Sequence, residues 1–434
     1  MEICIIGAGH VGLVTAACFA DLGHKVICVD NDAAKVASLR KGRATFYEPG
    51  LEAMVVRNLS KKRLSFTTKI ADGVSRSHVV FIAVGTPPLA SGDADLTAVE
   101  EVSRHIALSM TSYRLVVEKS TVPVETGKWV HHTLKTFVRK NIPFDVASNP
   151  EFLREGSAIH DFLHPDRIVI GVESESAQRI LTDLYKSFKV PLMVTDIASA
   201  ELIKHASNAF LAMKISFINA VASICERVGA DVEKVAQGAG MDHRIGRAFL
   251  NPGVGYGGFC FPKDVEAFIR IAEKLGYDFD LLKAVKRINE DQRRLLVKKV
   301  EKHLWNLKGK RIGILGLAFK PETDDLRFAP SLDVISSLVK AGAHLTAYDP
   351  QAMKEARKTL KGIGFAKDPY QLARGADCLV ILTEWKEFRE LNLARIKKLM
   401  RQPVIVDGRN IYDPVKMKRL EFDYACIGRA KILS

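Results

Sequence analysis

The sequence predicts an α/β protein built from two Rossmann-like, doubly wound domains that are joined by a long central helix and a helical middle domain. Short apolar segments alternate with helix-compatible segments near the start of the chain and again after residue 305. This alternation is typical of parallel sheets with crossover helices. Between these regions lies a long stretch with helical spacing. We therefore expect domains over residues 1–196, 197–304 and 305–434.

The first domain opens with a strand, a glycine-rich turn, a helix and a second strand. Ile3–Ile6 is apolar, Val14–Leu22 is compatible with a helix, Gly23 is a C-cap candidate, and Val26–Val29 is the next strand. Further strands are expected at Val79–Val84, Leu115–Val117 and Ile168–Ile170.

The middle of the chain predicts one long helix over Ser199–Val228, because no Gly or Pro interrupts its apolar residues. Further helical segments follow to about Leu304. The long helix is apolar over a wide face, so it could serve as a spine between domains or between subunits.

The last domain repeats the opening pattern. Residues 312–317 indicate a strand and a turn, Ser331–Ala341 a helix, and Leu345–Tyr348 a strand that Asp349 closes. The segment GAHLTAYD resembles the earlier GHKVICVD, and ARGADCLVILTEW resembles SRSHVVFIAVGTPP. We therefore expect two related sheets.

The composition is that of an ordinary soluble globular protein, with 434 residues, 47% hydrophobic and 26% charged. We expect no membrane span, no signal peptide and a cytoplasmic location. The seven cysteines include no CxxC pair, so neither a disulfide scaffold nor a metal site is expected. The net charge of +14 fits solubility, a phosphate-bearing substrate or nucleic acid. Because the basic residues are scattered, we do not expect nucleic-acid binding.

A dinucleotide site is expected where Gly7, Gly9 and Gly12 follow the first strand and open a helix. Such glycines permit a tight turn, close approach to a pyrophosphate and close packing of helix on strand. Asp30 ends the next strand, where it would accept a hydrogen bond from a ribose 2′-hydroxyl and repel a 2′-phosphate. NAD is therefore favoured over NADP, the alternative being a turn without a ligand.

Two motifs come directly after predicted strands, and a third carries paired carboxylates. The segments from Val84 to Pro88 and from Ser120 to Pro123 lie at the sheet edge where ligands bind, although each could be a plain strand-to-loop turn. Glu151 and Glu155 are four residues apart and would share one face of a helical turn. They could act as base, water activator or ribose acceptor, or form a solvated acidic turn.

Lys204 and Asn208 are also four residues apart, on an otherwise apolar face of the predicted long helix. A buried ammonium is costly without a function. Together with an amide it could stabilise a developing alkoxide, unless the lysine simply extends to solvent.

Cys260 follows the glycines at positions 255, 257 and 258 and precedes Pro262 and Lys263. The glycines would let the backbone approach a ligand closely, and Pro262 is typical of a helix start. A thiol at a helix N-terminus beside a lysine is expected to have a lowered pKa and to be nucleophilic. Asp264 would reach a water or the thiol. The alternative for Cys260 is a small buried hydrophobic residue.

A nucleophilic thiol combined with NAD narrows the chemistry. Oxidation of an alcohol to an aldehyde needs no thiol. Oxidation of an aldehyde to an acid does use one, because the thiohemiacetal can lose a hydride and the resulting thioester can be hydrolysed.

These motifs together resemble the UDP-glucose/GDP-mannose dehydrogenase family over nearly the whole chain. The matching segments are GAGHVG, YEPGL, VGTPP, STVPVETG, NPEFLREGSAIHDF, ELIKHASNAFLAMKISFIN, RIGRAFLNPGVGYGGFCFPKD, LGLAFKPETDDLR and DGRN. The resemblance implies a four-electron oxidation of a nucleotide-sugar C6 alcohol to a carboxylate with two NAD. It also implies UDP-glucose as substrate and a homodimer built on the long helix.

The resemblance also implies roles for individual residues. Cys260 would carry the thiohemiacetal and thioester, Lys204 and Asn208 would stabilise the oxyanion, and Asp264, Thr121 and Glu151 would position and activate water. The implied NAD contacts are Gly7, Gly9, Val11, Gly12, Asp30, Lys35, Thr86, Thr121, Glu155, Lys263 and Arg327. The implied substrate contacts are Glu151, Phe152, Leu153, Arg154, Lys204, Asn208, Arg244, Phe249, Asn251, Gly253, Tyr256, Gly257, Cys260, Phe319, Lys320 and Arg409, with Arg244 reaching a neighbouring subunit's site.

Phe259 departs from the family, which often has a small or polar residue there. Three alternatives remain: a 6-dehydrogenase of GDP-mannose or of a UDP-N-acetyl-hexosamine, a two-electron dehydrogenase, and an NAD-sensing protein without turnover. A pure sensor has no need of Cys260, Lys204, Asn208 and Asp264 together.

Overall fold

The computed structural model describes residues 1–139 and 141–429. Contacts between Cα atoms divide the chain into two compact units. Unit 1 comprises Met1–Ser207 and Glu266–Gly276, and unit 2 comprises Asn208–Val265 and Tyr277–Ser434. The three domain ranges expected from the sequence stay a prediction, and residues 430–434 of the third range lie outside the described residues.

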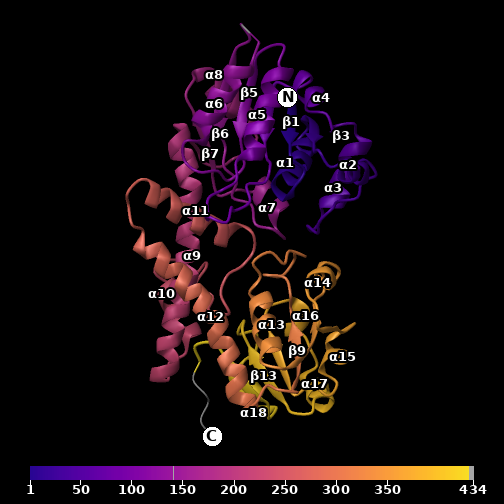
Figure 1. Ribbon diagram of the computed structural model, residues 1–434, viewed down its shortest axis with the longest axis vertical. Helices are drawn as coiled ribbons and strands as arrows, with labels where there is room; N and C mark the ends of the chain where they lie inside the picture. Colours follow the sequence, from indigo (N-terminus) through magenta and orange to yellow (C-terminus); the bar gives the residue numbers. More distant parts are fainter. Residues whose placement is uncertain (140, 430–434) are drawn as a thin grey trace. The chain divides into compact units, whose positions relative to one another are not determined.

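Unit 1 contains an eight-stranded sheet in the order β3-β2-β1-β4-β5-β6-β7-β8 (Figure 1). All neighbours are parallel except β6 and β7, which are antiparallel. The strands are β1 (Glu2–Ile6), β2 (Lys25–Val29), β3 (Leu64–Thr67), β4 (Val79–Ile82), β5 (Arg114–Glu118), β6 (Phe144–Ser148), β7 (Ile168–Val172) and β8 (Leu192–Thr195). The helices are α1 (His10–Asp21), α2 (Ala33–Arg40), α3 (Leu51–Ser60), α4 (Ile70–Ser75), α5 (Thr97–Ser109), α6 (Thr126–Phe137), α7 (Ala158–Leu163) and α8 (Glu175–Leu184). The strand order reverses between β1 and β4, the place where open α/β sheets bind ligands.

Both faces of this sheet are buried. Alternate residues of β1 belong to different apolar clusters: Ile3 and Ile5 pack with α1, whereas Cys4 and Ile6 pack with α5 and α6. The strands are therefore apolar throughout instead of alternating, as expected for a parallel sheet covered on both sides.

Unit 2 contains a six-stranded parallel sheet in the order β11-β10-β9-β12-β13-β14, drawn in orange to yellow in Figure 1. The strands are β9 (Arg311–Leu315), β10 (His344–Tyr348), β11 (Gly364–Phe365), β12 (Cys378–Ile381), β13 (Val404–Asp407) and β14 (Asp423–Cys426). The helices are α10 (Val232–Gly240), α12 (Asp280–Leu304), α13 (Pro330–Lys340), α14 (Met353–Thr359), α15 (Pro369–Ala373), α16 (Lys386–Arg389), α17 (Leu393–Leu399) and α18 (Pro414–Arg419).

Two helices begin in one unit and end in the other: α9 (Ile197–Val228) and α11 (Cys260–Lys274). α9 has 32 residues and ends before Gly229, which adopts a positive φ of 79°. Its length and apolar composition would suffice to cross a membrane, but one such helix is weak evidence because core helices pass the same test.

The predicted fold class is confirmed, with one mostly parallel sheet, one fully parallel sheet and a long helix between them in the sequence. Most predicted strand and helix limits lie within two residues of the observed ones. The first helix begins earlier than expected, at His10 instead of Val14, because Gly9, whose backbone is extended, is the N-cap residue of the helix. The similarity between the two ends of the chain is also real, since β1, β2 and β4 occupy the same places in their sheet as β9, β10 and β12.

Candidate active site

The glycine-rich turn of unit 1 is tightly packed at two glycines and open at the third. Gly7 adopts a φ of 106°, and a Cβ there would lie 2.3 Å from the Ala83 carbonyl oxygen. A Cβ on Gly12 would lie 1.9 Å from the Gly7 oxygen, whereas one on Gly9 would meet nothing within 4 Å. Gly7 and Gly12 therefore close the turn, and Gly9 leaves room beside it for a phosphate at the start of α1.

Asp30 ties this turn to the end of β2. One carboxylate oxygen accepts from the Ala8 N–H at 2.8 Å and from Lys35 Nζ at 3.0 Å, and the other accepts from the Asp32 N–H at 3.0 Å. The carboxylate is buried beside the turn, at the end of the strand where an acid that binds a ribose is expected.

Thr86 and Thr121 lie together at the ends of β4 and β5. The Thr86 hydroxyl donates to the Thr121 carbonyl oxygen at 2.8 Å, and Ser120 Oγ donates to the Val84 oxygen at 2.9 Å. The two sheet-edge motifs are therefore cross-linked at the switch point of the sheet, beside the glycine turn.

A buried ion pair joins Glu151 to Lys204. Lys204 Nζ donates to Glu151 Oε1 at 2.9 Å, and the other carboxylate oxygen accepts from the Leu153 N–H at 2.6 Å. Lys204 Nζ also lies 5.4 Å from the centre of the Phe152 ring. Glu151, Lys204, Phe152 and Leu153 thus form one cluster whose charges are compensated within it.

The expected helical pairing of Glu151 with Glu155 is wrong. Residues 151–154 are irregular, Glu155 lies in a turn, and the next helix, α7, begins only at Ala158. Glu151 instead bonds Lys204 and the Leu153 backbone N–H. The nearby Arg154 is exposed and forms a fork with Asp161 at 2.6 and 2.9 Å.

The sequence motifs did not reveal Lys119, which is buried in the same region. Its Nζ donates to Asn149 Oδ1 at 3.0 Å. Burial lowers its pKa to about 8, although the negative charge of Glu151 acts to raise it. The signal was available, because a lysine directly after an apolar strand at a ligand-binding sheet edge is unusual.

In unit 2, Cys260 is the first residue of α11. The other six cysteines are buried, whereas Cys260 is partly exposed. The helix begins at Cys260 itself, so Pro262 lies within its first turn instead of opening it. Cys260 therefore lies at a helix N-terminus, and the N–H groups of such an end favour a thiolate in general.

Asp264 connects two candidate residues. Its Oδ2 accepts from Asn208 Nδ2 at 2.6 Å, and its Oδ1 pairs with Lys263 Nζ at 2.7 Å. All three side chains are buried. Asp264 therefore orients the Asn208 amide while Lys263 compensates its charge.

The glycine loop before Cys260 is closed by protein atoms instead of being open to a ligand as expected. A Cβ on Gly255 would lie 2.6 Å from Asn289 Oδ1, one on Gly257 2.4 Å from the Phe328 oxygen, and one on Gly258 2.7 Å from the Phe319 ring. Asn289 also accepts from the Tyr256 N–H at 2.7 Å and donates to its carbonyl at 3.0 Å. Gly253 N–H donates to Asn219 at 2.8 Å.

Arg409 and the segment from Phe319 to Arg327 border this loop within unit 2. Arg409 donates to the Gly255 oxygen at 3.3 Å and to the Phe319 oxygen at 3.1 Å. Lys320 lies over the Phe319 ring, and Arg327 stacks 4.3 Å from the centre of the Phe259 ring. Phe259, the residue singled out as unusual, is thus packed against a predicted NAD contact.

The remaining candidates lie on the surface of unit 2 or beside the loop. Arg244 is highly exposed and forms a fork with Asp242 at 2.6 and 3.0 Å. Phe249 adopts a positive φ of 64° and packs against Phe261, and Asn251 is exposed. The structure thus gathers the predicted residues into two sets, one in each unit.

The first set fits NAD. An open glycine turn at a helix start, a carboxylate at the end of the second strand and cross-linked threonines at the switch point are the parts that a dinucleotide needs. A nucleotide-binding sheet combined with a partly exposed thiol at a helix N-terminus defines the class: an NAD-dependent dehydrogenase.

Three family models match the chain: the NAD binding domain of the UDP-glucose/GDP-mannose dehydrogenase family over residues 1–189, its central domain over 198–291, and its UDP binding domain over 313–414. The chain belongs to this family.

Similar proteins include UDP-glucose 6-dehydrogenase TuaD of Bacillus subtilis, 48% identical over 99% of this chain and 94% of the relative. UDP-glucose 6-dehydrogenase of Rhizobium meliloti is 47% identical over 99% of this chain and 100% of its own. A solved UDP-glucose dehydrogenase from the archaeon Pyrobaculum islandicum superposes with a TM-score of 0.91 at 42% identity, covering 98% of this chain and 96% of that one.

Proposed function

We propose that this chain is a UDP-glucose 6-dehydrogenase that oxidises the C6 alcohol of UDP-glucose to a carboxylate. The observation that carries the proposal is the setting of Cys260, the one partly exposed thiol among seven, at a helix start in a chain with a dinucleotide turn. Bound NAD would accept one hydride from C6 in each of two oxidations.

The chain's own residues supply the remaining chemistry. The Cys260 thiolate adds to the C6 aldehyde, and the oxygen takes a proton to give a thiohemiacetal. Loss of the C6 hydride leaves a thioester, which water cleaves to the carboxylate and the free thiol. One alcohol, two NAD and one water thus become a carboxylate, two NADH and three protons.

Lys204 and Asn208 serve the oxygen at C6. Each is held by a carboxylate, Lys204 by Glu151 and Asn208 by Asp264, so each donor is oriented before substrate binds. Glu151, with Thr121, activates the hydrolytic water. Asp264 acts mainly by holding Asn208 and Lys263 in place.

The test is NADH formed per nucleotide sugar consumed to completion, with UDP-glucose, UDP-N-acetyl sugars and GDP-mannose offered separately. We expect two NADH with UDP-glucose. Two NADH with a different sugar would keep the mechanism and change the assigned substrate. One NADH per sugar would exclude the thiol mechanism, and no NADH with any sugar would favour a binding protein without turnover. In Cys260→Ser, normal rates of acid formation would contradict the proposal.

We also propose that the protein is a homodimer built on α9. Phe210, Phe217 and Ile224 recur every seven residues and are 58%, 59% and 56% exposed. A seven-residue apolar repeat on a long helix is typical of a helix–helix seam, and the occupant we propose is a second copy of this chain. Sedimentation of Phe217→Glu should give a monomer where the wild type gives a dimer.

We place the reaction in the cytoplasm. All seven cysteines are free thiols, six of them buried, which fits a reducing compartment.

A further inference from the structure

We infer that Glu233 is a positioning residue for the sugar nucleotide, because its carboxylate ties together two segments of unit 2 that each carry predicted substrate contacts. One segment is residues 247–257, with Phe249, Asn251 and Tyr256, and the other is the turn at Arg409 and Asn410. The inference rests on the proposed function, and no sequence motif points to Glu233.

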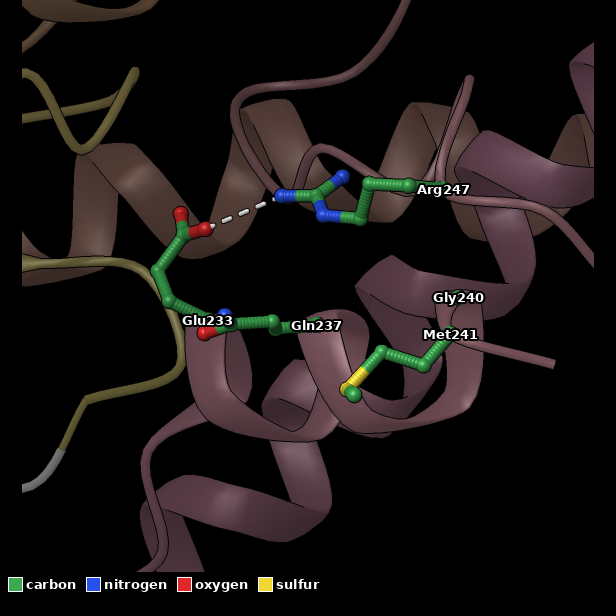
Figure 2. A pocket seen from close by; sticks show the side chains of 5 residues that line it. All are labelled: Glu233, Gln237, Gly240, Met241 and Arg247. Carbon is green, nitrogen blue, oxygen red and sulfur yellow. Dashed lines mark hydrogen bonds and ion pairs between the residues drawn. The ribbon is translucent and has the colours of Figure 1, made fainter.

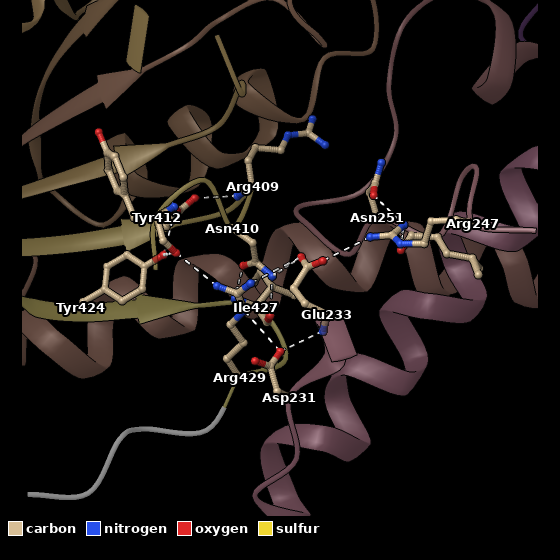
Figure 3. Close-up of polar contacts among 12 residues, drawn as sticks. Asp231, Glu233, Arg247, Asn251, Arg409, Asn410, Tyr412, Tyr424, Ile427 and Arg429 are labelled. Atoms are coloured by element: carbon tan, nitrogen blue, oxygen red, sulfur yellow. Dashed lines mark hydrogen bonds and ion pairs between the residues drawn. The ribbon is translucent and has the colours of Figure 1, made fainter. Parts of the chain in front are cut away.

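The two oxygens of Glu233 point in different directions. Oε2 accepts from Arg247 Nη2 at 3.2 Å, and Oε1 accepts from Asn410 Nδ2 at 3.3 Å (Figure 3). Glu233 lies in the first turn of α10, whose start is fixed because Asp231 accepts from the Glu233 N–H at 2.9 Å. A rigid helix end therefore holds both partners.

Arg247 passes this restraint to the first segment. Its Nη1 donates to the Leu250 carbonyl and to Asn251 Oδ1, both at 2.8 Å. Arg247 also packs against the end of α10, where a Cβ on Gly240 would lie 2.7 Å from the Arg247 Cα. These contacts place the backbone on both sides of Phe249, whose φ is already positive.

A hollow of about 410 Å³ lies beside the pair, lined by Glu233, Gln237, Gly240, Met241 and Arg247 (Figure 2). The Arg247 side chain is therefore not packed on that side, and polar contacts hold it there, whereas Leu250 and Val254 of the same segment lie in the apolar core of unit 2. The pair is partly exposed, with side-chain exposures of 39% and 28%, so its strength is that of a solvent-screened ion pair.

Asn410 passes the restraint to the second segment. It adopts a φ of 53°, and its amide bonds Ile427 in both directions, donating to the carbonyl at 2.8 Å and accepting from the N–H at 2.9 Å. The preceding residue, Arg409, reaches Gly255 and Phe319. Arg429 adds a third arm, 4.0 Å from Glu233 Oε1 and 3.4 Å from Asp231 (Figure 3).

Residues 247–257 form no helix or strand, so their position depends on the burial of Leu250 and Val254 and on cross-links such as that of Glu233 to Arg247. Removing the Glu233 charge weakens the restraint on Arg247 and Asn410 together, while Arg247 keeps its bonds to residues 250 and 251 and Asn410 keeps its bonds to Ile427. Substrate binding then bears the cost of ordering the segment, which weakens substrate and transition-state binding alike. The expected signature is a raised KM for the sugar nucleotide with kcat unchanged.

The test compares Glu233→Gln with Lys234→Gln, an exposed neighbour on the same helix. We expect the KM for UDP-glucose to rise roughly three- to tenfold in Glu233→Gln, with kcat and the KM for NAD within about twofold of wild type. Lys234→Gln should match wild type. Arg247→Gln should raise the same KM, and the double variant should show less than the product of the two effects.

An unchanged KM for UDP-glucose in both Glu233→Gln and Arg247→Gln would overturn the inference. So would equal losses in all kinetic parameters, or effects that multiply fully in the double variant. Calorimetric titration with UDP-glucose separates this inference from the proposed function. Binding by wild type without turnover overturns only the function, and binding that is weakened by Glu233→Gln still supports the positioning role.

Discussion

The two sheets of this protein begin with the same frame, which consists of the first strand, the glycine turn after it and the aspartate at the end of the second strand. The two units use this frame differently. In unit 1, Gly7 has a φ of 106° and its N–H donates to Val29, and in unit 2 Gly316 has a φ of 95° and its N–H donates to Tyr348. In both, an aspartate at the end of the second strand accepts backbone N–H groups of the turn: Asp30 from Ala8, and Asp349 from Leu317 and Ala318.

The two frames diverge immediately after the turn. In unit 1 the helix starts at His10, which leaves a short glycine turn with open space at Gly9. In unit 2 the chain runs from Gly316 to Ala329 before α13 begins, and Trp385 fills the place beside Asp349 by donating to it at 3.1 Å. One frame thus offers backbone N–H groups to a pyrophosphate, and the other supports a long loop that presents Phe319, Lys320 and Arg327.

Alanine at the glycines should give the largest effects. Gly7→Ala and Gly316→Ala combine a positive φ with a Cβ less than 2.5 Å from protein atoms, so each should lower the free energy of unfolding by about 4 kcal/mol. In Gly9→Ala the added Cβ meets nothing within 4 Å and φ is normal. The free energy of unfolding should therefore change by less than about 0.5 kcal/mol, while the affinity for NAD falls. Urea unfolding and NAD titration measure both, and normal NAD binding by Gly9→Ala would contradict the open-turn interpretation.

The next largest difference is expected between the effects of replacing Asp349 and Asp30. Asp349 accepts from five donors, so Asp349→Asn should cost about 3 kcal/mol of stability with no change in cofactor preference. Asp30→Asn should cost less stability but lower the preference for NAD over NADP at least roughly tenfold, since a repulsive charge is removed. The measurements are unfolding curves and kcat/KM with each cofactor. An Asp30→Asn variant that still rejects NADP would show that another group sets the preference.

Two further strands also end in matching carboxylates, Glu118 on β5 and Asp407 on β13. Burial raises the pKa of Glu118 to about 8, and its Oε2 meets no hydrogen-bond donor within the described residues. Burial also raises the pKa of Asp407, but the Arg409 and Tyr412 N–H groups and the Tyr424 hydroxyl donate to it.

Because folded Glu118 holds its proton above its usual pKa, the free energy of unfolding should fall as pH rises from about 4.5 toward 8. Glu118→Gln cannot ionise, so it should lessen that fall by at most about 1.4 kcal/mol per pH unit. Burial raises the pKa of Glu201 to about 7, so part of the slope should remain. Asp407→Asn should instead lose stability at every pH. Parallel pH profiles for wild type and Glu118→Gln would exclude an ionisable Glu118 in this window.

The strands, the long helix and the glycine turn could be predicted because each depends on neighbouring residues, through apolar runs and positive φ. The positions of Cys260 at a helix start and of Lys204 and Asn208 four residues apart on α9 were also accessible, since such spacing is local. The contacts of Glu233, Asn289 and Lys119 were not, because each joins a side chain to backbone or polar groups distant in sequence. The helical pairing of Glu155 with Glu151 was wrong for the same reason: Glu151 bonds Lys204, which lies far along the chain.

The smallest predicted effect concerns the long loop of the second frame. Arg327 is held by Asp325 at 2.7 and 2.9 Å, and it stacks on Phe259, the residue before Cys260. A cation over an aromatic ring is worth about 1 kcal/mol at a partly exposed site, so Phe259→Leu should raise the KM for NAD about fivefold, and Phe259→Tyr should leave it near wild type. Steady-state kinetics with saturating UDP-glucose decides this. If Leu and Tyr behave alike, the ring does not position Arg327, and the long loop of unit 2 has no part in cofactor binding through that arginine.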